Sequence, residues 1–385
     1  MSVPDPTTTP LQADSAQAND ERWMNQALDL ARRSVGLASP NPVVGCVLVK
    51  GDAMIGQGFH QYDRLDHAEI VALKMAGGEA CGATVYVTLE PCSHTGRTGP
   101  CSDALIEAGV ARVVVATADP NPEVNGRGIA RLRDAGIAVD VGAGERQARE
   151  LNDGFARYIR TRLPFVTLKA GVSLDGRIAP APGKAVPGAP VMLTGEASRA
   201  AVQWMRHGAD ALITGINTVL VDDPLLTDRT GLLRRRRLLR VVLDSALRLR
   251  LDSKIVRTAQ DDVLVFCTIP VSERQRALEA LGVRVERIEA GPGGARVSLK
   301  RVLERLGEME IISAMIEAGS QMTTSALGLH AVDKMNLFYA PLLLGAAGVP
   351  LLNSIESTRP QWARITMEQL GQDFWFEGYL RDPWE

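Results

Sequence analysis

Three potential metal ligands lie in separate segments of the first half of this 385-residue sequence: His67, Cys92 and Cys101. One imidazole and two thiols suit a tetrahedral metal ion, and three protein ligands with the fourth position open are typical of a catalytic zinc site. Glu69 follows His67 by two residues and is well placed to move protons for the group in the fourth position. A fold that uses this site has to bring these segments together.

A structural zinc site is the alternative interpretation of the same residues. It needs a fourth protein ligand, and the candidates are Cys46, Cys81, His60 and His94. Cys46 lies in a predicted strand and Cys81 in a predicted turn, and neither has a metal-like spacing to the other ligands. We therefore favour the catalytic site, and we interpret Cys46, Cys81 and Cys267 as ordinary free cysteines.

Composition excludes several classes of protein. The net charge is −2 and aromatic residues make up 4% of the chain, which argues against a nucleic-acid-binding protein. No apolar run is long enough to span a bilayer. The first 19 residues have no basic start and no apolar core, so we expect a disordered tail rather than a signal peptide or anchor. Five cysteines in a long chain do not suggest a disulfide framework, and we expect a cytoplasmic protein.

Strand and helix patterns alternate along residues 20–163, which predicts a three-layer α/β domain. We expect strands over residues 43–49, 54–59, 84–88, 112–117 and 137–141, and helices over 22–35, 67–75 and 129–135, with another beginning at Cys101. His67 and Cys101 both stand where a helix begins. Helix N-termini carry partial positive charge, which helps to hold thiolates.

A second α/β pattern begins after Leu163, and we place a domain boundary there. The second domain, residues 164–385, has an α/β pattern of its own. Its predicted strands are residues 165–172, 211–214, 240–243, 262–266, 310–316 and 335–339. It contains no G-x-G-x-x-G motif, so a Rossmann domain is not supported.

Specific motifs link both domains to a known family. The H-x-E and P-C…C grouping is the signature of zinc nucleobase deaminases, here with eight residues between the cysteines instead of two. The run from Thr88 to Cys101, together with Pro40-Asn41-Pro42, closely resembles the bifunctional riboflavin-biosynthesis deaminase/reductase family of bacteria. Gly99 stands where the family usually has a second proline. The resemblance implies a cytidine-deaminase-like N-terminal domain and a dihydrofolate-reductase-like C-terminal domain.

For the first domain, the resemblance implies one zinc ion per chain, held by His67, Cys92 and Cys101, with Glu69 as the proton shuttle. It also implies that Asn41 holds the pyrimidine of a pyrimidine ribotide substrate. His94 and Arg97 are expected near the ribose phosphate of that substrate.

For the second domain, the resemblance implies reduction of the ribosyl group to ribityl by NADPH. The positions that match substrate contacts are Lys169, Arg206, Leu226, Arg229 and Glu317. Those that match coenzyme contacts are Gly171, Thr218, Asp222, Ser245, Gly319, Ser320, Gln321, Met322, Thr323, Thr324 and Ser325. A strand, a glycine turn and a helix start at Gly319 also form a ready anion site. The sequence leaves the proton carrier open among Asp175, Lys169 and Glu317, and a purely structural Lys169–Glu317 ion pair is the alternative.

One departure from the family leaves a second function open. Pro190 and Met192 stand where the family has a serine and a tryptophan that touch substrate and cofactor, so an active deaminase with a weakened or non-catalytic reductase domain is the alternative. A deaminase of cytidine nucleotides or tRNA bases is another, which the Ser93–Arg97 insertion disfavours. We expect a homo-oligomer, either a dimer or a tetramer.

Overall fold

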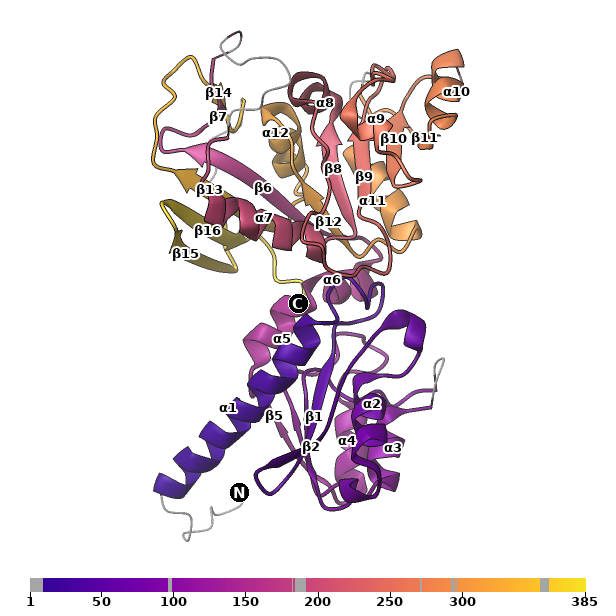
Figure 1. Cartoon of the computed structure of the whole chain (residues 1–385), viewed down its shortest axis with the longest axis vertical. Coiled ribbons are helices and arrows are strands. Elements are labelled where there is room, and N and C mark those ends of the chain that lie inside the picture. Colours follow the sequence, from indigo (N-terminus) through magenta and orange to yellow (C-terminus); the bar gives the residue numbers. More distant parts are fainter. Residues whose placement is uncertain are drawn as a thin grey trace. The chain divides into compact units, whose positions relative to one another are not determined.

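The computed structural model describes residues 10–95, 99–181, 183, 192–270, 272–291, 294, 296–353 and 360–385, with the side chains of 10–16 left out (Figure 1). The chain forms two compact units. The first comprises Met1–Arg160 with Trp384, and the second comprises Thr161–Pro383 with Glu385.

The first unit is built on a five-stranded sheet in the order β2-β1-β3-β4-β5. Its strands are β1 (Gly45–Lys50), β2 (Ala53–Phe59), β3 (Thr84–Val87), β4 (Arg112–Val115) and β5 (Ala138–Val141). β1 pairs antiparallel with β2 and β3, whereas β3, β4 and β5 run parallel. All five strands lie where the sequence predicts them, to within two residues at either end.

Helices cover both faces of this sheet. The helices are α1 (Pro10–Arg32), α2 (Ala68–Ala76), α3 (Cys101–Glu107), α4 (Arg127–Asp134), α5 (Glu145–Leu151) and α6 (Asp153–Thr161), with short 3-10 turns at Tyr62–Arg64 and Gly77–Ala80. Side chains of a strand alternate between its faces. In β1, Cys46 and Leu48 pack with α2, α3 and α4, while Val47 and Val49 pack with α1 and α5. The unit therefore has the three-layer architecture that the sequence predicts.

A glycine in β2 sets the position of α2. A Cβ on Gly58 would lie 2.3 Å from the carbonyl oxygen of Ala68, closer than real Cβ atoms approach. Because glycine has none, the first turn of α2 packs directly against the strand. His67 immediately precedes this turn, so the close packing also places one of the predicted metal ligands.

Helix α1 begins earlier than expected. Its first residue is Pro10, so residues 10–19, expected to be disordered, are helical, whereas residues 1–9 lie outside the described part of the chain. The contacts of Asp20 explain why this polar segment is helical although its composition suggests disorder. Its carboxylate accepts hydrogen bonds from Arg112 at 2.8 and 2.7 Å and from the Tyr86 hydroxyl at 2.8 Å. These partners lie 66 and 92 residues along the chain, and they anchor a helix whose preceding turns are polar.

The second unit contains a nine-stranded sheet in the order β11-β10-β9-β8-β12-β6-β13-β16-β15. These strands are β6 (Phe165–Ser173), β8 (Ala211–Gly215), β9 (Leu239–Leu243), β10 (Val263–Cys267), β11 (Val283–Arg287), β12 (Ser313–Ile316), β13 (Lys334–Ala340), β15 (Arg364–Leu370) and β16 (Asp373–Tyr379). The seven strands from β11 to β13 are parallel, and β16 and β15 add an antiparallel edge. A separate antiparallel pair joins β7 (Arg177–Ala179) to β14 (Val349–Pro350).

The second sheet is also covered on both faces. The helices are α7 (Glu196–Gly208), α8 (Ile216–Asp222), α9 (Lys254–Arg257), α10 (Glu273–Glu279), α11 (Leu299–Glu308) and α12 (Ser320–Gly328). Val241 of β9 packs in the core that includes α11 and α12, while Val242 packs in the core that includes α8, α9 and α10. Parallel strands buried on both faces read as continuous apolar runs, which is why most of them are visible in the sequence.

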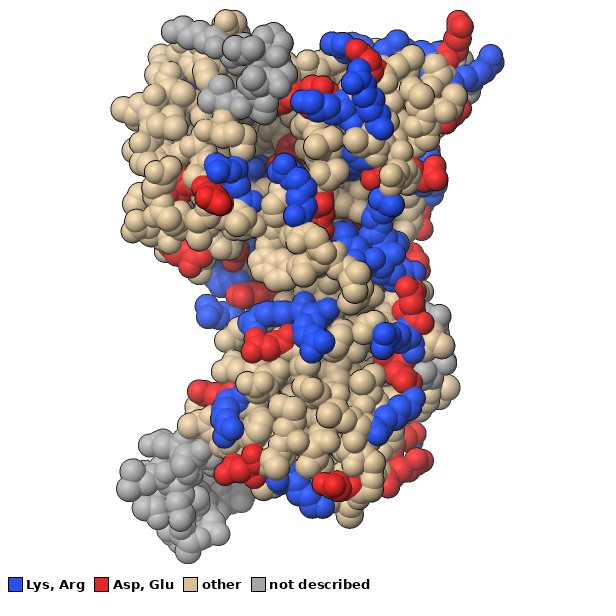
Figure 2. All heavy atoms as spheres, in the orientation of Figure 1, with Lys and Arg blue, Asp and Glu red and all other residues tan. Residues whose placement is uncertain are grey.

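No described helix combines the length and apolar character needed to cross a membrane. On the face seen in Figure 2, basic and acidic side chains are interspersed, in keeping with a net charge of −2. Some of these exposed charges form ion pairs, such as Arg301–Glu304 and Arg250–Asp252.

Candidate active sites

The three predicted zinc ligands come together in the first unit. The ligand atoms of His67, Cys92 and Cys101 all lie within 4.8 Å of one another. Nδ1 of His67 is 3.1 Å from Sγ of Cys101 and 3.5 Å from Sγ of Cys92. This nitrogen therefore faces both sulfur atoms, as it must if the three residues bind one ion.

Two helix starts and one strand end deliver these ligands. His67 is the residue that caps α2, and Cys101 is the first residue of α3. Cys92 follows the end of β3, and its sulfur accepts a hydrogen bond from the backbone N–H of Cys101 at 3.2 Å. Free N–H groups and the helix dipole stabilise a thiolate at this place.

The two thiols differ in acidity because they share a hydrogen bond. That bond from Cys101, together with His67, lowers the pKa of Cys92 to about 4. The same pairing, followed by burial, raises the pKa of Cys101. The hydrogen bond to Cys92 raises the pKa of His67 to about 8. The cluster thus holds protons that a metal ion displaces when it binds.

The donor set fits a zinc ion with an open fourth position. None of the other candidate ligands considered from the sequence (Cys46, Cys81, His60 and His94) belongs to this cluster within the part of the chain that the structure describes. Cys81 is exposed, and Cys46 is buried in β1. One nitrogen and two sulfur ligands without a fourth protein ligand is the arrangement of a catalytic zinc.

A cavity of about 280 Å³ opens beside the cluster. Asn41, Glu69 and His94 line it, as do two of the metal ligands, His67 and Cys92. Glu69 is 3% exposed, and its burial raises its pKa, so its carboxyl group is suited to carry a proton. Arg97, predicted to lie near a ribose phosphate, falls outside the described residues.

Three further polar residues line this cavity and were not predicted to contact a substrate: His60, Asp119 and Asn121. His60 is buried like a core histidine, but Asn41 Nδ2 lies 3.0 Å from its Nε2, and its Nδ1 lies 3.0 Å from the Asp66 carbonyl oxygen. Since an amide nitrogen only donates, Nε2 accepts and Nδ1 carries the proton. His60 therefore fixes the direction of the Asn41 amide.

Burial raises the pKa of Asp119 to about 7, although Oδ1 accepts a hydrogen bond from the Asn121 N–H at 2.8 Å. The sequence signal that could have found both residues is the Asp119-Pro120-Asn121-Pro122 segment.

Glu90 ties the metal ligand Cys92 to the rest of the cavity wall. Its carboxylate is 3% exposed and accepts four backbone hydrogen bonds. The N–H groups of Asp119 and Gly126 donate to Oε2 at 3.0 and 2.9 Å, and those of Gly128 and Ile129 donate to Oε1 at 2.8 and 3.2 Å. One side chain thus joins the end of β3 to the loop after β4 and to the start of α4.

Gly128 makes that junction possible. A Cβ at this position would lie 1.9 Å from the carbonyl oxygen of Pro91. The absence of a side chain lets α4 begin directly against the Pro91–Cys92 turn, which sequence periodicity does not reveal.

The second unit brings together three of its predicted substrate residues. Glu317, which follows β12, binds Arg206 of α7 through Oε1 at 2.7 Å and Oε2 at 3.0 Å, and Lys169 of β6 lies 3.4 Å from Oε2. Burial alone would raise the pKa of Glu317, but the charges of Lys169 and Arg206 lower it to about 2. Glu317 is therefore a fixed anion that orients two cations.

Leu226 and Arg229 lie in the loop that follows α8. Leu226 is buried with a φ of 54°, a left-handed conformation that is strained for leucine. The neighbouring Thr227 carbonyl accepts a hydrogen bond from Arg206 Nη1 at 3.0 Å, which joins this loop to the Glu317 cluster. Arg229 is exposed, and its backbone N–H donates to Gln203.

Asp175 has hydrogen-bond partners of its own, none of which belongs to the Glu317 cluster. Its carboxylate accepts hydrogen bonds from the Ser173 hydroxyl and from the N–H groups of Leu344 and Gly345. These bonds, the one from Ser173 first, lower its pKa to about 2.

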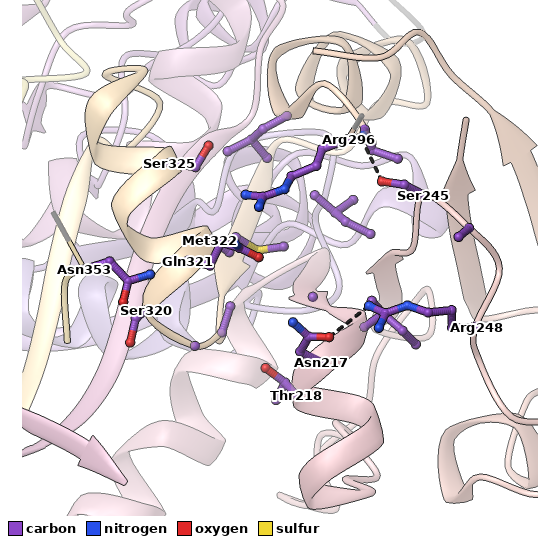
Figure 3. A pocket seen from close by; sticks show the side chains of 18 residues that line it. Asn217, Thr218, Ser245, Arg248, Arg296, Ser320, Gln321, Met322, Ser325 and Asn353 are labelled. Carbon is purple, nitrogen blue, oxygen red and sulfur yellow. Dashed lines mark hydrogen bonds between the residues drawn. The ribbon is translucent and has the colours of Figure 1, made fainter. Parts of the chain in front are cut away.

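A larger cavity, of about 620 Å³, lies at the carboxyl ends of β8, β9 and β12 (Figure 3). Seven predicted coenzyme residues line it: Thr218, Ser245, Gly319, Ser320, Gln321, Met322 and Ser325. Gly319 caps α12, so the first N–H groups of this helix face the cavity. A helix N-terminus at the wall of this cavity suits a phosphate-bearing coenzyme.

The remaining predicted coenzyme residues do not line this cavity: Gly171, Asp222, Thr323 and Thr324. Thr323 is fully buried, and Thr324 Oγ1 accepts a hydrogen bond from the Asn353 N–H. Gly171 lies on β6, where a Cβ would meet the Thr194 methyl at 3.3 Å. Pro190 falls outside the described residues, and Met192 is exposed.

Comparison with known proteins places both halves in one family. Residues 164–376 match the RibD C-terminal domain, and residues 17–117 match the cytidine and deoxycytidylate deaminase zinc-binding region. The riboflavin biosynthesis protein RibD of Aquifex aeolicus (strain VF5) is 40% identical over 357 residues, which cover 92% of this chain and 96% of that protein. The chain belongs to the RibD family.

Solved structures agree with this assignment. RibD of Acinetobacter baumannii is 39% identical and superposes with a TM-score of 0.79, covering 94% of this chain and 99% of that one. The diaminohydroxyphosphoribosylaminopyrimidine deaminase/5-amino-6-(5-phosphoribosylamino)uracil reductase of Thermotoga maritima is 32% identical, with the same TM-score and coverage. The matched zinc-binding region of this RibD-family chain contains all three clustered ligands, and its RibD C-terminal domain contains the Glu317 cluster.

Replacing Glu90 tests its role in positioning Cys92. A Glu90→Gln variant exchanges one oxygen for an NH2 group and leaves two backbone N–H groups facing a donor. Each buried group left unpaired costs about 1–3 kcal/mol. We expect a lower thermal unfolding temperature and faster loss of zinc to a competing chelator. The exposed Glu123→Gln is the matched control, and equal behaviour of the two variants would refute this role.

Glu317→Gln tests the buried anion. We expect a loss of roughly 3 kcal/mol, the lower end for a broken buried pair, because the three side chains keep 11–19% exposure. The pKa of Glu317 is depressed, so its contribution is complete above about pH 4.5 and is lost as the pH falls towards 2. Urea unfolding between pH 3 and 7 checks this. The unfolding transition to follow is the one that zinc does not shift, because the zinc ligands belong to the other unit.

The control for that experiment is Glu308→Gln, because Glu308 forms an exposed i,i+3 pair with Arg305. We expect this variant to change the free energy of unfolding by less than about 0.5 kcal/mol. A Glu317 effect that stays constant down to pH 3 or below would contradict the depressed pKa.

Proposed function

We propose that this protein catalyses two successive steps of riboflavin biosynthesis. The first unit deaminates the diaminopyrimidine ribosylamino phosphate, and the second reduces the ribosyl group of the product to a ribityl chain with NADPH. Family membership supports both activities. The observation that carries the proposal is the open His67–Cys92–Cys101 cluster beside the buried Glu69, at the wall of a cavity.

In the first unit, a zinc ion held by these three residues would act as a Lewis acid that lowers the pKa of water. Glu69 takes a proton from the attacking water and delivers it to a ring nitrogen. It then takes the second proton from the added oxygen and gives it to the amine, so that the C–N bond breaks, ammonia leaves and the ring carbon becomes a carbonyl. The raised pKa of Glu69 suits a group that both accepts and returns a proton.

The cavity wall orients the pyrimidine. We assign to Asn41, held by His60, the recognition of its polar edge, and we add Asp119 and Asn121, which line the same cavity. His94 and Arg97 remain our candidates for the ribose phosphate. These groups offer donors and acceptors in fixed directions, which a small polar ring requires.

In the second unit, NADPH supplies a hydride when bound. Glu317 and Asp175 both have a pKa near 2, so neither holds a proton at neutral pH. Among the three candidates considered from the sequence, we therefore assign the proton to the Lys169 ammonium, which Glu317 orients. Arg206, fixed by the same carboxylate, is our candidate for binding the substrate.

The alternative of a non-catalytic reductase unit has no support. Lys169, Arg206 and Glu317 meet, and the cavity of about 620 Å³ beside them retains most of the predicted coenzyme residues. We also propose that the protein acts in the cytoplasm, because its five cysteines are free thiols and two of them are metal ligands. A homo-oligomer remains our proposal, to be tested by the mass of the assembly in solution.

Glu69→Gln separates proton transfer from metal binding. The amide has the same shape but cannot shuttle a proton, so we expect ammonia release to fall about 100-fold or more. Zinc content and coenzyme-dependent reduction of the deaminated ribotide should stay normal. The exposed Glu79→Gln is the control. A zinc-loaded Glu69→Gln protein that deaminates at the normal rate would remove Glu69 from the mechanism.

Removing zinc tests the division of labour. We expect a chelator to abolish ammonia release from the diaminopyrimidine ribotide, because the metal ligands serve only that reaction. Reduction of the deaminated ribotide should continue, as measured by NADPH consumption, and added zinc should restore deamination. Loss of both activities on chelation would show that the metal also serves the reductase.

A further inference from the structure

The coenzyme cavity has a basic side. Arg248 and Arg296 are the charged residues among the 18 described residues that line it, and that lining includes no aspartate or glutamate. A site that prefers NADH typically uses a carboxylate to bind the 2′-hydroxyl of the adenosine ribose, whereas an arginine accommodates the 2′-phosphate of NADPH. The lining of this cavity, with arginines and no carboxylate, is of the kind that accommodates NADPH.

The order of the strands tells which end of the coenzyme lies near these arginines. β6, β12, β8 and β9 are neighbours in that order, and all run parallel. The reacting group lies by Lys169 and Glu317, on β6 and at the end of β12. The start of α12, which follows β12, suits the pyrophosphate. A dinucleotide that continues in the same direction passes the end of β8 and places its adenosine at the end of β9.

Arg248 lies at that end of the sheet, shortly after β9. Its Nη2 donates to Asn217 Oδ1 at 2.9 Å, and Asn217 belongs to the segment that follows β8 (Figure 3). The remaining guanidinium donors are available at the cavity. Ser245 stands three residues earlier and lines the same wall.

Arg296 approaches from another segment. The N–H of its neighbour Val297 donates to Ser245 Oγ at 3.0 Å, which ties this segment to the end of β9 and leaves the serine proton free to be donated. With the Gln321 amide turned so that its oxygen faces the guanidinium, Arg296 donates to it at 2.9 and 2.7 Å. Arg296 therefore reaches from the β9 side towards α12.

We propose that Arg248 and Arg296 bind the 2′-phosphate of NADPH, with Ser245 as an additional donor, and so determine the preference for NADPH over NADH. This inference rests on the proposed reductase function. A phosphate dianion gains charge-assisted hydrogen bonds from a guanidinium group that a 2′-hydroxyl cannot supply.

Equilibrium binding distinguishes a contact to the 2′-phosphate from a contact to a part that NADPH and NADH share. Arg248→Gln and Arg296→Gln are titrated with NADPH and NADH, followed by coenzyme fluorescence, and with 2′,5′-ADP and 5′-AMP, followed by calorimetry. We expect each variant to bind NADPH and 2′,5′-ADP about 10-fold or more weakly, the effect of losing a hydrogen bond to a charged group. Binding of NADH and 5′-AMP should change less than about 3-fold on the same grounds.

Arg250→Gln is the matched control, because Arg250 is exposed, pairs with Asp252 and does not line the cavity. A thermal unfolding profile that matches the wild-type profile shows that the second unit is folded in every variant.

A variant that weakens NADPH and NADH equally would mark a pyrophosphate contact and overturn the assignment of that arginine, as would unchanged binding of NADPH. Both results leave the reductase function standing. A wild-type protein that binds neither coenzyme would overturn the reductase function and this inference with it.

Discussion

A carboxylate buried in a protein is costly unless its surroundings compensate, and three buried glutamates organise the two sites of this chain. Glu90 receives four backbone N–H groups, so it joins segments of the main chain. Glu317 receives two cations, which lower its pKa to about 2 and make it a fixed negative charge. At Glu69 burial outweighs the charge of His67 and the local hydrogen bonds, so its pKa is raised and its carboxyl group is suited to carry a proton. The same residue type thus joins main-chain segments at Glu90, fixes a negative charge at Glu317 and, in the mechanism we propose, carries a proton at Glu69.

Both sites also follow from where parallel strands end. In the first unit, β3 leads to Glu90 and Cys92, and the neighbouring parallel strand β4 leads to Asp119. In the second, β12 leads to Glu317 and to the start of α12, while β8 and β9 lead to the opposite wall of the coenzyme cavity. Because parallel strands present their carboxyl ends at one edge, segments far apart in the sequence supply side chains to one place.

The sequence predicts those parts of the fold and sites that depend on local pattern. Apolar runs locate most strands, and His67 and Cys101 are correctly placed where helices begin. Contacts between distant segments are not visible in such patterns. The helix before Asp20 was missed because its anchors are Tyr86 and Arg112. The antiparallel strands β15, which is mostly exposed, and β16, which is partly buried, lack the continuous apolar signal of the parallel strands and were also missed.

The same limit applies within the sites. His60 reads as an ordinary histidine until the structure shows it against Asn41, and Arg248 and Arg296 read as surface residues until they line one cavity. Each set of site residues nevertheless belongs to one compact unit: the zinc cluster and its cavity lie within residues 41–159, and the Glu317 cluster and coenzyme cavity within residues 169–353. The geometry of either set is therefore determined by the packing of its own unit. The two sites share no residue, so a substitution that displaces the zinc ligands does not directly alter the Glu317 cluster. We therefore expect the two reactions to be separable although one chain carries both sites.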